Sequence, residues 1–286
     1  MRRAISFRKV APYALLIPGL IWLGLFFVYP AIQMFLVSLW TGNVQDGFEQ
    51  TWNWGIYPEA VTEYWPWIAR SIVYGGLATL LAFALGFPLA YAIAFRGGQY
   101  KNLLLFLVIA PFFTSFLIRT ISWKILLGDE GPLLGPLKHT FGILPGTFTL
   151  LGTPVAQVAG LTYNFLPFMI LPLYVALEKI DPRLIEAAAD LYAGRWEAFR
   201  RVTFPLALPG VFAGSLLTFI PAMGDYINAE LLGNPQTRMI GNVIQNRLLI
   251  QNDYPVGSAL SFILMGAILV AVALYARALG TEQLTG

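Results

Sequence analysis

Long apolar stretches separated by short polar segments dominate the hydropathy pattern of this chain. A helix needs about 20 mostly apolar residues to cross the hydrocarbon core of a membrane. Six stretches reach this length, at roughly Tyr13–Trp40, Trp67–Phe95, Leu103–Leu127, Val155–Leu177, Leu206–Met223 and Val256–Ala276. No linker indicates a second domain. The pattern therefore predicts an all-α, polytopic membrane protein with six transmembrane helices in a single domain over residues 1–286.

The distribution of charge predicts how these spans are oriented. Lys and Arg concentrate in the cytoplasmic segments of membrane proteins. Placing the N-terminus in the cytoplasm puts 12 of the 18 Lys and Arg residues on the inner side. The first outer segment, Thr41 to Pro66, then holds four acids and no basic residue. We therefore expect both termini in the cytoplasm. The outer connection from Gly128 to Thr153 is rich in Gly and Pro, which predicts turns rather than long helices.

Composition narrows the possible functions. Only 12% of the residues are charged, about half the share in soluble domains. The basic residues lie in short pieces between apolar segments, so they do not indicate binding to nucleic acid. The chain has no cysteine, one histidine (His139) and no GxxxxGK[ST] phosphate loop. The sequence therefore offers no catalytic residue, no metal site and no cofactor site of its own.

One segment between the fourth and fifth spans, Glu178 to Gly210, is dense in charges of both signs. Asp181 followed by Pro182 favours a helix start, and Gly194 suits the helix stop. Between them, apolar and charged side chains recur on opposite sides at helical spacing, with Leu184, Ala187, Ala188 and Leu191 on one and Arg183, Glu186 and Asp190 on the other. A second short helix is expected from Arg195. This pattern fits either an amphipathic helix pair at the lipid headgroups or a surface that docks a partner.

The sequence EAAADLYAGRWEAFRRVTFP within this segment resembles the EAA loop of membrane permease subunits of bacterial ABC importers. Glu186, Ala187, Ala188 and Pro205 match that pattern, whereas Tyr192 takes the place of its glycine. In this family the loop docks into a cleft on a separate ATPase subunit. The resemblance implies that Glu186 orients the docking helix. The implied coupling interface consists of Glu186, Ala187, Ala188, Asp190, Tyr192, Gly194, Arg195 and Pro205.

Three further stretches, Ala110–Leu127, Gly160–Asp181 and Pro221–Gln245, look like the permeases of spermidine/putrescine importers. The resemblance implies a type I ABC importer permease fold in the bacterial cytoplasmic (inner) membrane. It also implies four partners beside the lipid bilayer: an ATPase subunit dimer carrying ATP and Mg, a second permease subunit, an extracytoplasmic substrate-binding protein and the polyamine. The chain itself is then a transport subunit and not an enzyme.

A polyamine path needs carboxylates for charge and aromatic faces for cation–π contacts. Asp225, Tyr226 and Glu230 follow the fifth span at its outer end, and Tyr163 with Asn164 lies within the fourth. These five residues are the candidates for the substrate pathway. The alternatives are that the two acids are solvated loop residues and that Tyr163 and Asn164 make polar contacts between helices.

Arg119 stands near the outer end of the third predicted span. Its side chain can extend to the membrane interface or pair with an acid such as Asp225. Because a bare cation repels a polycation, we expect a structural ion pair. Other functions stay open on sequence alone. One is a permease for another cargo, such as ferric iron, a phosphonate or an opine. Another is a channel or secondary transporter that needs no ATPase.

Overall fold

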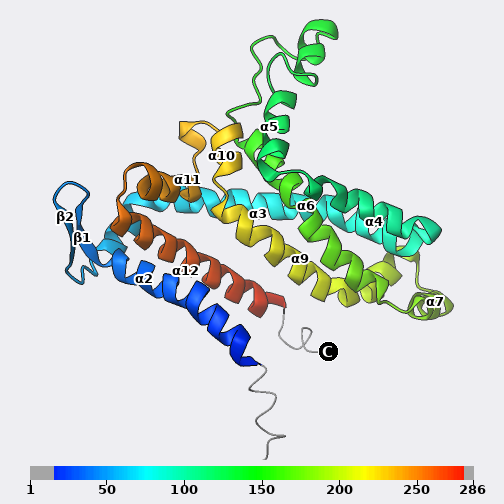
Figure 1. Ribbon diagram of the computed structural model, residues 1–286. Helices are drawn as coiled ribbons and strands as arrows, with labels where there is room; N and C mark the ends of the chain where they lie inside the picture. The colour runs from blue at the N-terminus through cyan, green and yellow to red at the C-terminus, as the bar shows by residue number, and fades with distance from the viewer. Residues whose placement is uncertain (1–15, 280–286) are drawn as a thin grey trace, which may run out of the picture. The chain divides into compact units, whose positions relative to one another are not determined.

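The computed structural model describes residues 16–279, and nearly all of its elements are helices (Figure 1). The first helix is Leu16–Ser38, which contains a π-helical turn at Gly24–Val28 and ends in α2 (Tyr29–Ser38). The other helices are α3 (Ile56–Arg96), α4 (Lys101–Ile109), α5 (Phe116–Leu126), α6 (Pro154–Glu178), α7 (Pro182–Asp190), α8 (Arg195–Ala198), α9 (Phe204–Gly224), α10 (Ile227–Leu232), α11 (Ile240–Gln245) and α12 (Tyr254–Leu279). Short 3-10 or π-helical turns lie at Gly98–Tyr100, Ala110–Phe113, Pro136–Thr140, Phe199–Thr203, Pro235–Thr237 and Asn246–Ile250.

Within residues 16–279, five helices are long and apolar enough to cross a membrane, and a bent pair makes a sixth candidate. The prediction of six spans is confirmed in this form. The third predicted span, Leu103–Leu127, is not one straight helix, because Gly98–Phe113 and Phe116–Leu126 meet at 92°. The carbonyl of Pro111 accepts hydrogen bonds from the backbone N–H of Thr114 and from its hydroxyl, at 3.2 and 2.7 Å. Thr114 is extended, so the helix ends there.

The second span begins eleven residues earlier than predicted, at Ile56 instead of Trp67. Ile56, Ala60, Tyr64 and Ile68 are all buried at a spacing of four residues, which carries the helix through the segment expected to be a loop. What remains of that loop holds an antiparallel hairpin of β1 (Trp40–Asn43) and β2 (Gly47–Gln50), in which Trp40 faces Gln50. The hairpin was not predicted.

The described residues fall into two compact units. One combines residues up to Glu63 with Ile244–Ile263. Inside it, the rings of Phe35 and Phe262 meet edge to face at 5.5 Å, and Arg247 binds the carboxylate of Asp253 at 3.1 Å. The other unit combines Tyr64–Val243 with residues from Leu264 onward and contains every candidate site residue.

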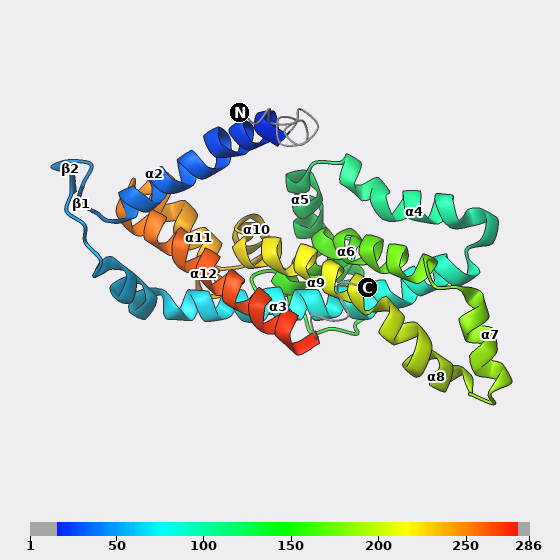
Figure 2. The same ribbon diagram turned by 90° about the horizontal axis from the view of Figure 1, so that it is seen from below.

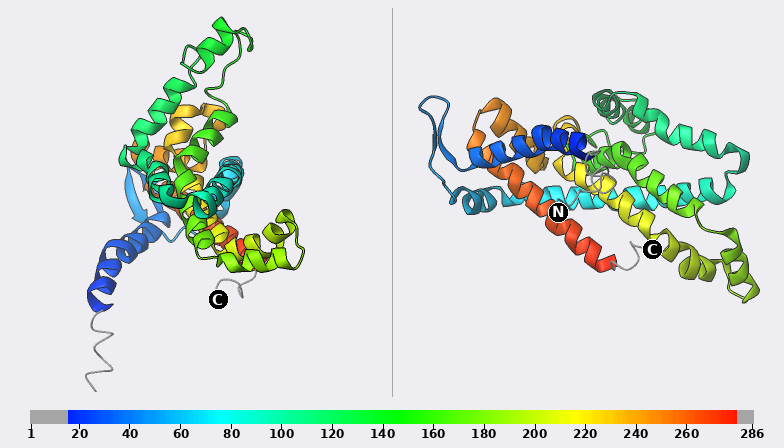
Figure 3. Two further views of the ribbon diagram at one scale, coloured as in Figure 1. Left: turned by 90° about the vertical axis from the view of Figure 1, so that its right-hand side faces the viewer. Right: turned by 60° about the horizontal axis from the view of Figure 1, so that its bottom comes forward.

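The core of the larger unit is the packing of α6 along α9 (Figures 1 and 2). Two glycines of α9 make this close approach possible. A Cβ at Gly210 would lie 2.5 Å from the Cβ of Ala176, and one at Gly214 would lie 2.9 Å from the carbonyl oxygen of Met169. Residues from α3, α6 and α9 complete the core, with Phe87, Met169, Ile170, Leu173, Leu177, Ala207 and Val211 among its buried members. At one end of the pair α7 and α8 extend outward, and beyond α5 the connection of residues 128–153 projects away, mostly as turns, as predicted (Figure 3).

Candidate functional site

The hairpin of α7 and α8 begins with the cap that the sequence predicts. The side chain of Asp181 accepts a hydrogen bond from the backbone N–H of Arg183 at 2.9 Å, and Pro182 occupies the first helical position. Proline fits there because its missing N–H has no partner in the first turn of a helix. Two turns later α7 ends at Asp190. The segment is therefore a well-defined helix outside the apolar spans.

The turn between the two helices corrects the prediction that Gly194 stops α7. The residue in the left-handed conformation is Tyr192, with φ of 61°. The N–H of Ala193 bonds to the carbonyl of Ala188 at 3.0 Å, and the N–H of Tyr192 bonds to that of Ala189 at 2.9 Å. This pair of bonds is a Schellman motif, whose left-handed position glycine usually fills. Gly194 is instead extended and directly precedes α8.

The side chains around this turn form an exposed surface, which we call the hairpin surface. Tyr192 is 98% exposed, and the large, exposed apolar side chains of Leu191 and Trp196 flank it. Glu186, Asp190 and Arg195 are exposed as well and form no ion pair within residues 16–279. Ala187 is exposed and Ala188 half-buried, and Pro205 lies exposed at the start of α9. Apolar side chains gathered at one exposed turn are typical of a surface that binds a partner.

Phe199 anchors the hairpin to the spans. Its ring stacks on that of Trp196, with 5.4 Å between the ring centroids. It meets the ring of Phe87, on α3, edge to face with a centroid distance of 5.7 Å. It also contacts Tyr91 of α3 at 6.3 Å and Phe204, the first residue of α9, at 6.1 Å.

Arg195–Gly224 is one continuous helix with a π-helical turn at Phe199–Thr203, so the separate short helix expected from Arg195 is instead the start of the fifth span. A displacement of the hairpin surface therefore reaches α9 along this helix, and Phe199 adds ring contacts to α3.

The predicted pathway acids lie in two different environments. Asp225 is 8% exposed, and its Oδ1 accepts a hydrogen bond from the backbone N–H of Asn228 at 2.7 Å, so it caps α10. Burial raises the pKa of the Asp225 carboxyl to about 6, although its hydrogen bonds oppose the shift. Glu230 is exposed and accepts a hydrogen bond from Asn242 Nδ2 at 3.2 Å. Tyr226 is also exposed, and its carbonyl accepts from the same Nδ2.

The other two pathway candidates are not brought together. Asn164 is buried, and its Nδ2 donates to Asn228 Oδ1 at 3.0 Å and to Thr120 Oγ1 at 3.1 Å. This network ties α5, α6 and α10 together, as the alternative of polar helix contacts expects. The ring of Tyr163 lies 5.4 Å from that of Trp123, and Tyr163 lines a separate cavity of about 290 Å³ between α3, α4 and α6.

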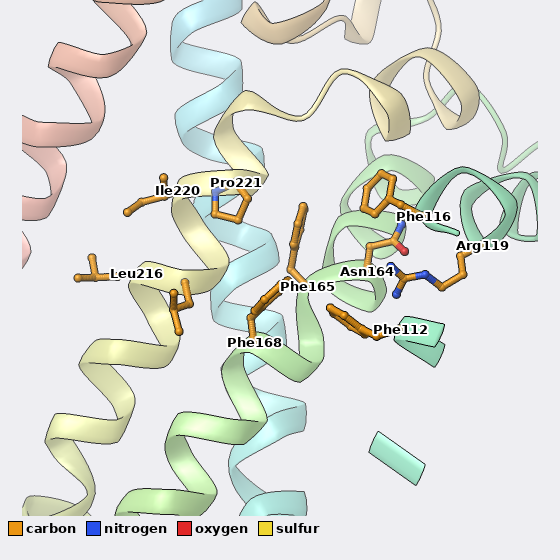
Figure 4. Close-up of a pocket in the computed structure, with 10 residues that line it drawn as sticks. Phe112, Phe116, Arg119, Asn164, Phe165, Phe168, Leu216, Ile220 and Pro221 are labelled. Atoms are coloured by element: carbon orange, nitrogen blue, oxygen red, sulfur yellow. The ribbon is translucent and has the colours of Figure 1, made fainter. Parts of the chain in front are cut away.

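Arg119 does not form the predicted ion pair with Asp225. No ion pair within residues 16–279 includes Arg119, and the Asp225 carboxylate caps α10 instead. The guanidinium lies over the rings of Phe112 and Phe116, 4.6 and 5.6 Å from their centroids. It borders a cavity of about 490 Å³, which we call the Arg119 cavity, between α5, α6 and α9 (Figure 4). The sequence showed the charge but not these surroundings, because the rings come from both sides of the break before α5.

Comparisons with known proteins give a consistent picture. Residues 82–279 match the family described as binding-protein-dependent transport system inner membrane component. The spermidine/putrescine transport system permease protein PotB of Haemophilus influenzae is 39% identical over 265 residues, covering 90% of each chain. PotB of Escherichia coli is 36% identical over 253 residues, covering 87% of this chain and 92% of the relative. A bacterial alginate ABC transporter, solved in complex with an alginate pentasaccharide-bound periplasmic protein, contains a chain of the same fold, with a TM-score of 0.77, 19% identity and coverage of 97% and 96%.

Proposed function

Because the chain belongs to the family of binding-protein-dependent transport system inner membrane components, we propose that it is the permease through which an ATP-driven importer moves spermidine, putrescine or a similar polyamine into the cytoplasm. The observation that carries the cargo is the 36–39% identity to spermidine/putrescine permeases over about nine-tenths of the chain. The protein lies in the inner membrane as a multi-pass subunit. It is a transport subunit, and ATP hydrolysis takes place on a separate subunit.

We propose that the hairpin surface is where this ATPase subunit docks. Tyr192 and Trp196 would enter a cleft on the ATPase, with Leu191 beside them, and Glu186 would orient α7. Closure of an ATPase dimer then displaces the hairpin. The displacement passes to α9 along the continuous helix Arg195–Gly224, and Phe199 passes it to α3 through its contact with Phe87. The spans respond by opening alternately to the two sides of the membrane.

The remaining partners in this proposal are a second permease subunit and an extracytoplasmic substrate-binding protein. The binding protein would release its polyamine at the outer end of α9. Glu230 and Tyr226 are the exposed residues there, so a carboxylate and an aromatic face are both available to an ammonium group. Asp225 contributes less directly, because its carboxylate holds α10 in place.

Reconstitution of the four-part transporter in proteoliposomes tests the function. ATP-dependent uptake of labelled spermidine and putrescine is expected, and unlabelled polyamines should compete with it. Competition by ferric iron, a phosphonate or an opine instead would overturn the cargo. Uptake by this chain alone, without the ATPase, would overturn the importer.

A further inference from the structure

We infer that the guanidinium of Arg119 pairs with a carboxylate of the companion permease, which enters the Arg119 cavity. This inference rests on the proposed function, since it needs a second permease beside this chain. Arg119 is only 8% exposed, and neither its Nε nor its Nη1 has a hydrogen-bond acceptor among the described residues. The charge stands within a bent pair of helices that together are apolar enough to span a membrane.

A guanidinium whose buried Nε and Nη1 lack an acceptor is costly. Removing a cation from water carries a large penalty, and a carboxylate nearby is the usual compensation in a membrane protein. The cation–π contacts with Phe112 and Phe116 recover only a small part of that penalty. No Asp or Glu within residues 16–279 forms an ion pair with Arg119. The described residues therefore supply no carboxylate to Arg119, and we assign that acid to the companion permease.

The cavity has room for such a side chain. Its volume is about 490 Å³, and Figure 4 shows the guanidinium pointing toward Asn164 and the ring of Phe112. The opposite wall consists of apolar side chains of α9, among them Leu217 and Ile220, which are exposed. Of the residues that the structure describes, Arg119 is the only charged one that borders the cavity. A carboxylate that enters is therefore held by Arg119 alone and not by competing charges.

The charge of the proposed cargo argues against the cargo as the occupant. Spermidine and putrescine are polycations, so they are repelled by Arg119 and cannot neutralise it. A carboxylate fixed on a neighbouring membrane protein has the required sign, and it loses little freedom when it pairs because its helix already holds it in the membrane. The companion permease is the membrane-embedded partner that the proposed function supplies.

Thiol cross-linking tests the contact directly, because the chain contains no cysteine. Arg119→Cys is combined in the full transporter with a companion permease whose native cysteines are removed and whose membrane-embedded Asp and Glu positions are replaced by Cys one at a time. One position is expected to link the two permeases through a short bifunctional thiol reagent, because the long Arg side chain of such a pair holds the two Cα atoms farther apart than a direct disulfide allows. Lys124→Cys, which replaces an exposed cation on the same helix, should give none with that position. Failure of every position, while a known contact pair elsewhere links, would overturn the inference.

Charge exchange tests the energetics without a thiol. Arg119→Glu is expected to lower recovery of the companion permease with the tagged chain by about 30-fold or more, since one partner of a buried pair is reversed. Replacing the cross-linked Asp or Glu of the companion permease by Arg should restore its recovery with the Arg119→Glu chain. Arg119→Lys and Lys124→Glu should each leave recovery near wild type. Full recovery and uptake in Arg119→Met would overturn the pairing.

Two further outcomes separate the sources of negative charge and the two proposals. Assembly of the wild type that depends on inorganic phosphate or chloride, with no cross-link, would assign the cavity to a soluble anion and overturn the inference. Spermidine uptake by the wild-type transporter is measured in the same vesicles. A transporter that cross-links at Arg119→Cys, while its wild type imports no polyamine, would refute the cargo and leave the pairing standing.

Discussion

Replacing Tyr192 by Gly should strengthen the turn of the hairpin and weaken its binding to the ATPase. Tyr192 holds the left-handed position of the Schellman motif, with φ of 61°. L-residues pay about 1–2 kcal/mol for that conformation, and glycine does not. The phenol ring is 98% exposed, so its removal loses no packing within the isolated chain. A costly conformation at a fully exposed aromatic residue is best explained by a contact that the ring makes elsewhere.

The size of the binding effect follows from the ring. Complete burial of a side chain of this size is worth about 1.5–3 kcal/mol. Because about 1.4 kcal/mol corresponds to a factor of ten, the Kd for the ATPase subunit should rise roughly 10- to 100-fold in Tyr192→Gly. The isolated permease should become more stable toward unfolding of α7 by about 1 kcal/mol. The two changes have opposite signs, which distinguishes docking from a general loss of structure.

Titration of the detergent-purified chain with the ATPase subunit measures the Kd, and amide hydrogen exchange in α7 measures the local stability. Tyr192→Phe should keep both wild-type values. Tyr192→Asn, which tolerates the left-handed region, should bind as weakly as Tyr192→Gly. The reasoning fails if Tyr192→Gly binds the ATPase with wild-type affinity, because the exposed ring would then have no partner at this surface.

Three other changes test the packing, the coupling and the buried acid. Gly210→Ala should lower the unfolding free energy by about 1–3 kcal/mol, because the added Cβ overpacks against Ala176. The control is Gly266→Ala, since a Cβ there meets nothing within 4 Å. The thermal unfolding temperature should fall in the first variant and not in the second. Phe199→Ala should leave ATPase binding near wild type but lower ATP-driven uptake by about tenfold or more, and equal losses of both would show that the ring merely holds the hairpin together. Because folding raises the pKa of Asp225 from 3.8 to about 6, its contribution to stability is fully present below pH 3.8 and is lost as the pH rises through 6. The loss amounts to roughly 3 kcal/mol of unfolding free energy. In Asp225→Asn, the unfolding free energy measured between pH 4 and 7 should no longer fall with pH in this way. The same pH dependence in Asp225→Asn and wild type would contradict the raised pKa.

Hydropathy was sufficient to predict the number of spans. A helix can cross the hydrocarbon core only where about 20 consecutive residues are mostly apolar, and such stretches are visible in the sequence itself. The break in the third span was missed. The helix ends where Thr114 is extended and its hydroxyl bonds to the carbonyl of Pro111, and a count of apolar residues does not show this. The early start of α3 was missed for a related reason, since burial of Ile56 and Ala60 depends on tertiary packing.

At the candidate site too, features set by neighbouring residues were predicted and features set by distant residues were not. The cap at Asp181 is local and was predicted correctly, whereas the turn was assigned to Gly194 because glycine is the commonest left-handed residue. Tyr192 occupies that position without being the residue that local preference favours. The surroundings of Arg119 combine rings from both sides of a break with a wall from α9, so no stretch of sequence contains them.

The contacts within the larger unit make the walls of the Arg119 cavity one body. Thr120 and Asn164 bind α5 to α6, and Gly210 and Gly214 fix α6 against α9. Helix α9 continues for 21 residues from Phe204, beside the hairpin, to the end that carries the α9 wall of the cavity. At 1.5 Å per residue this is about 30 Å. Because packed interiors transmit strain and do not absorb it, a displacement at Phe199 moves the whole cavity together. Under the proposed pairing, the motion occurs between this body and the companion permease. A charge pair at that boundary can separate and form again in each cycle, which an interlocked apolar contact cannot do as easily.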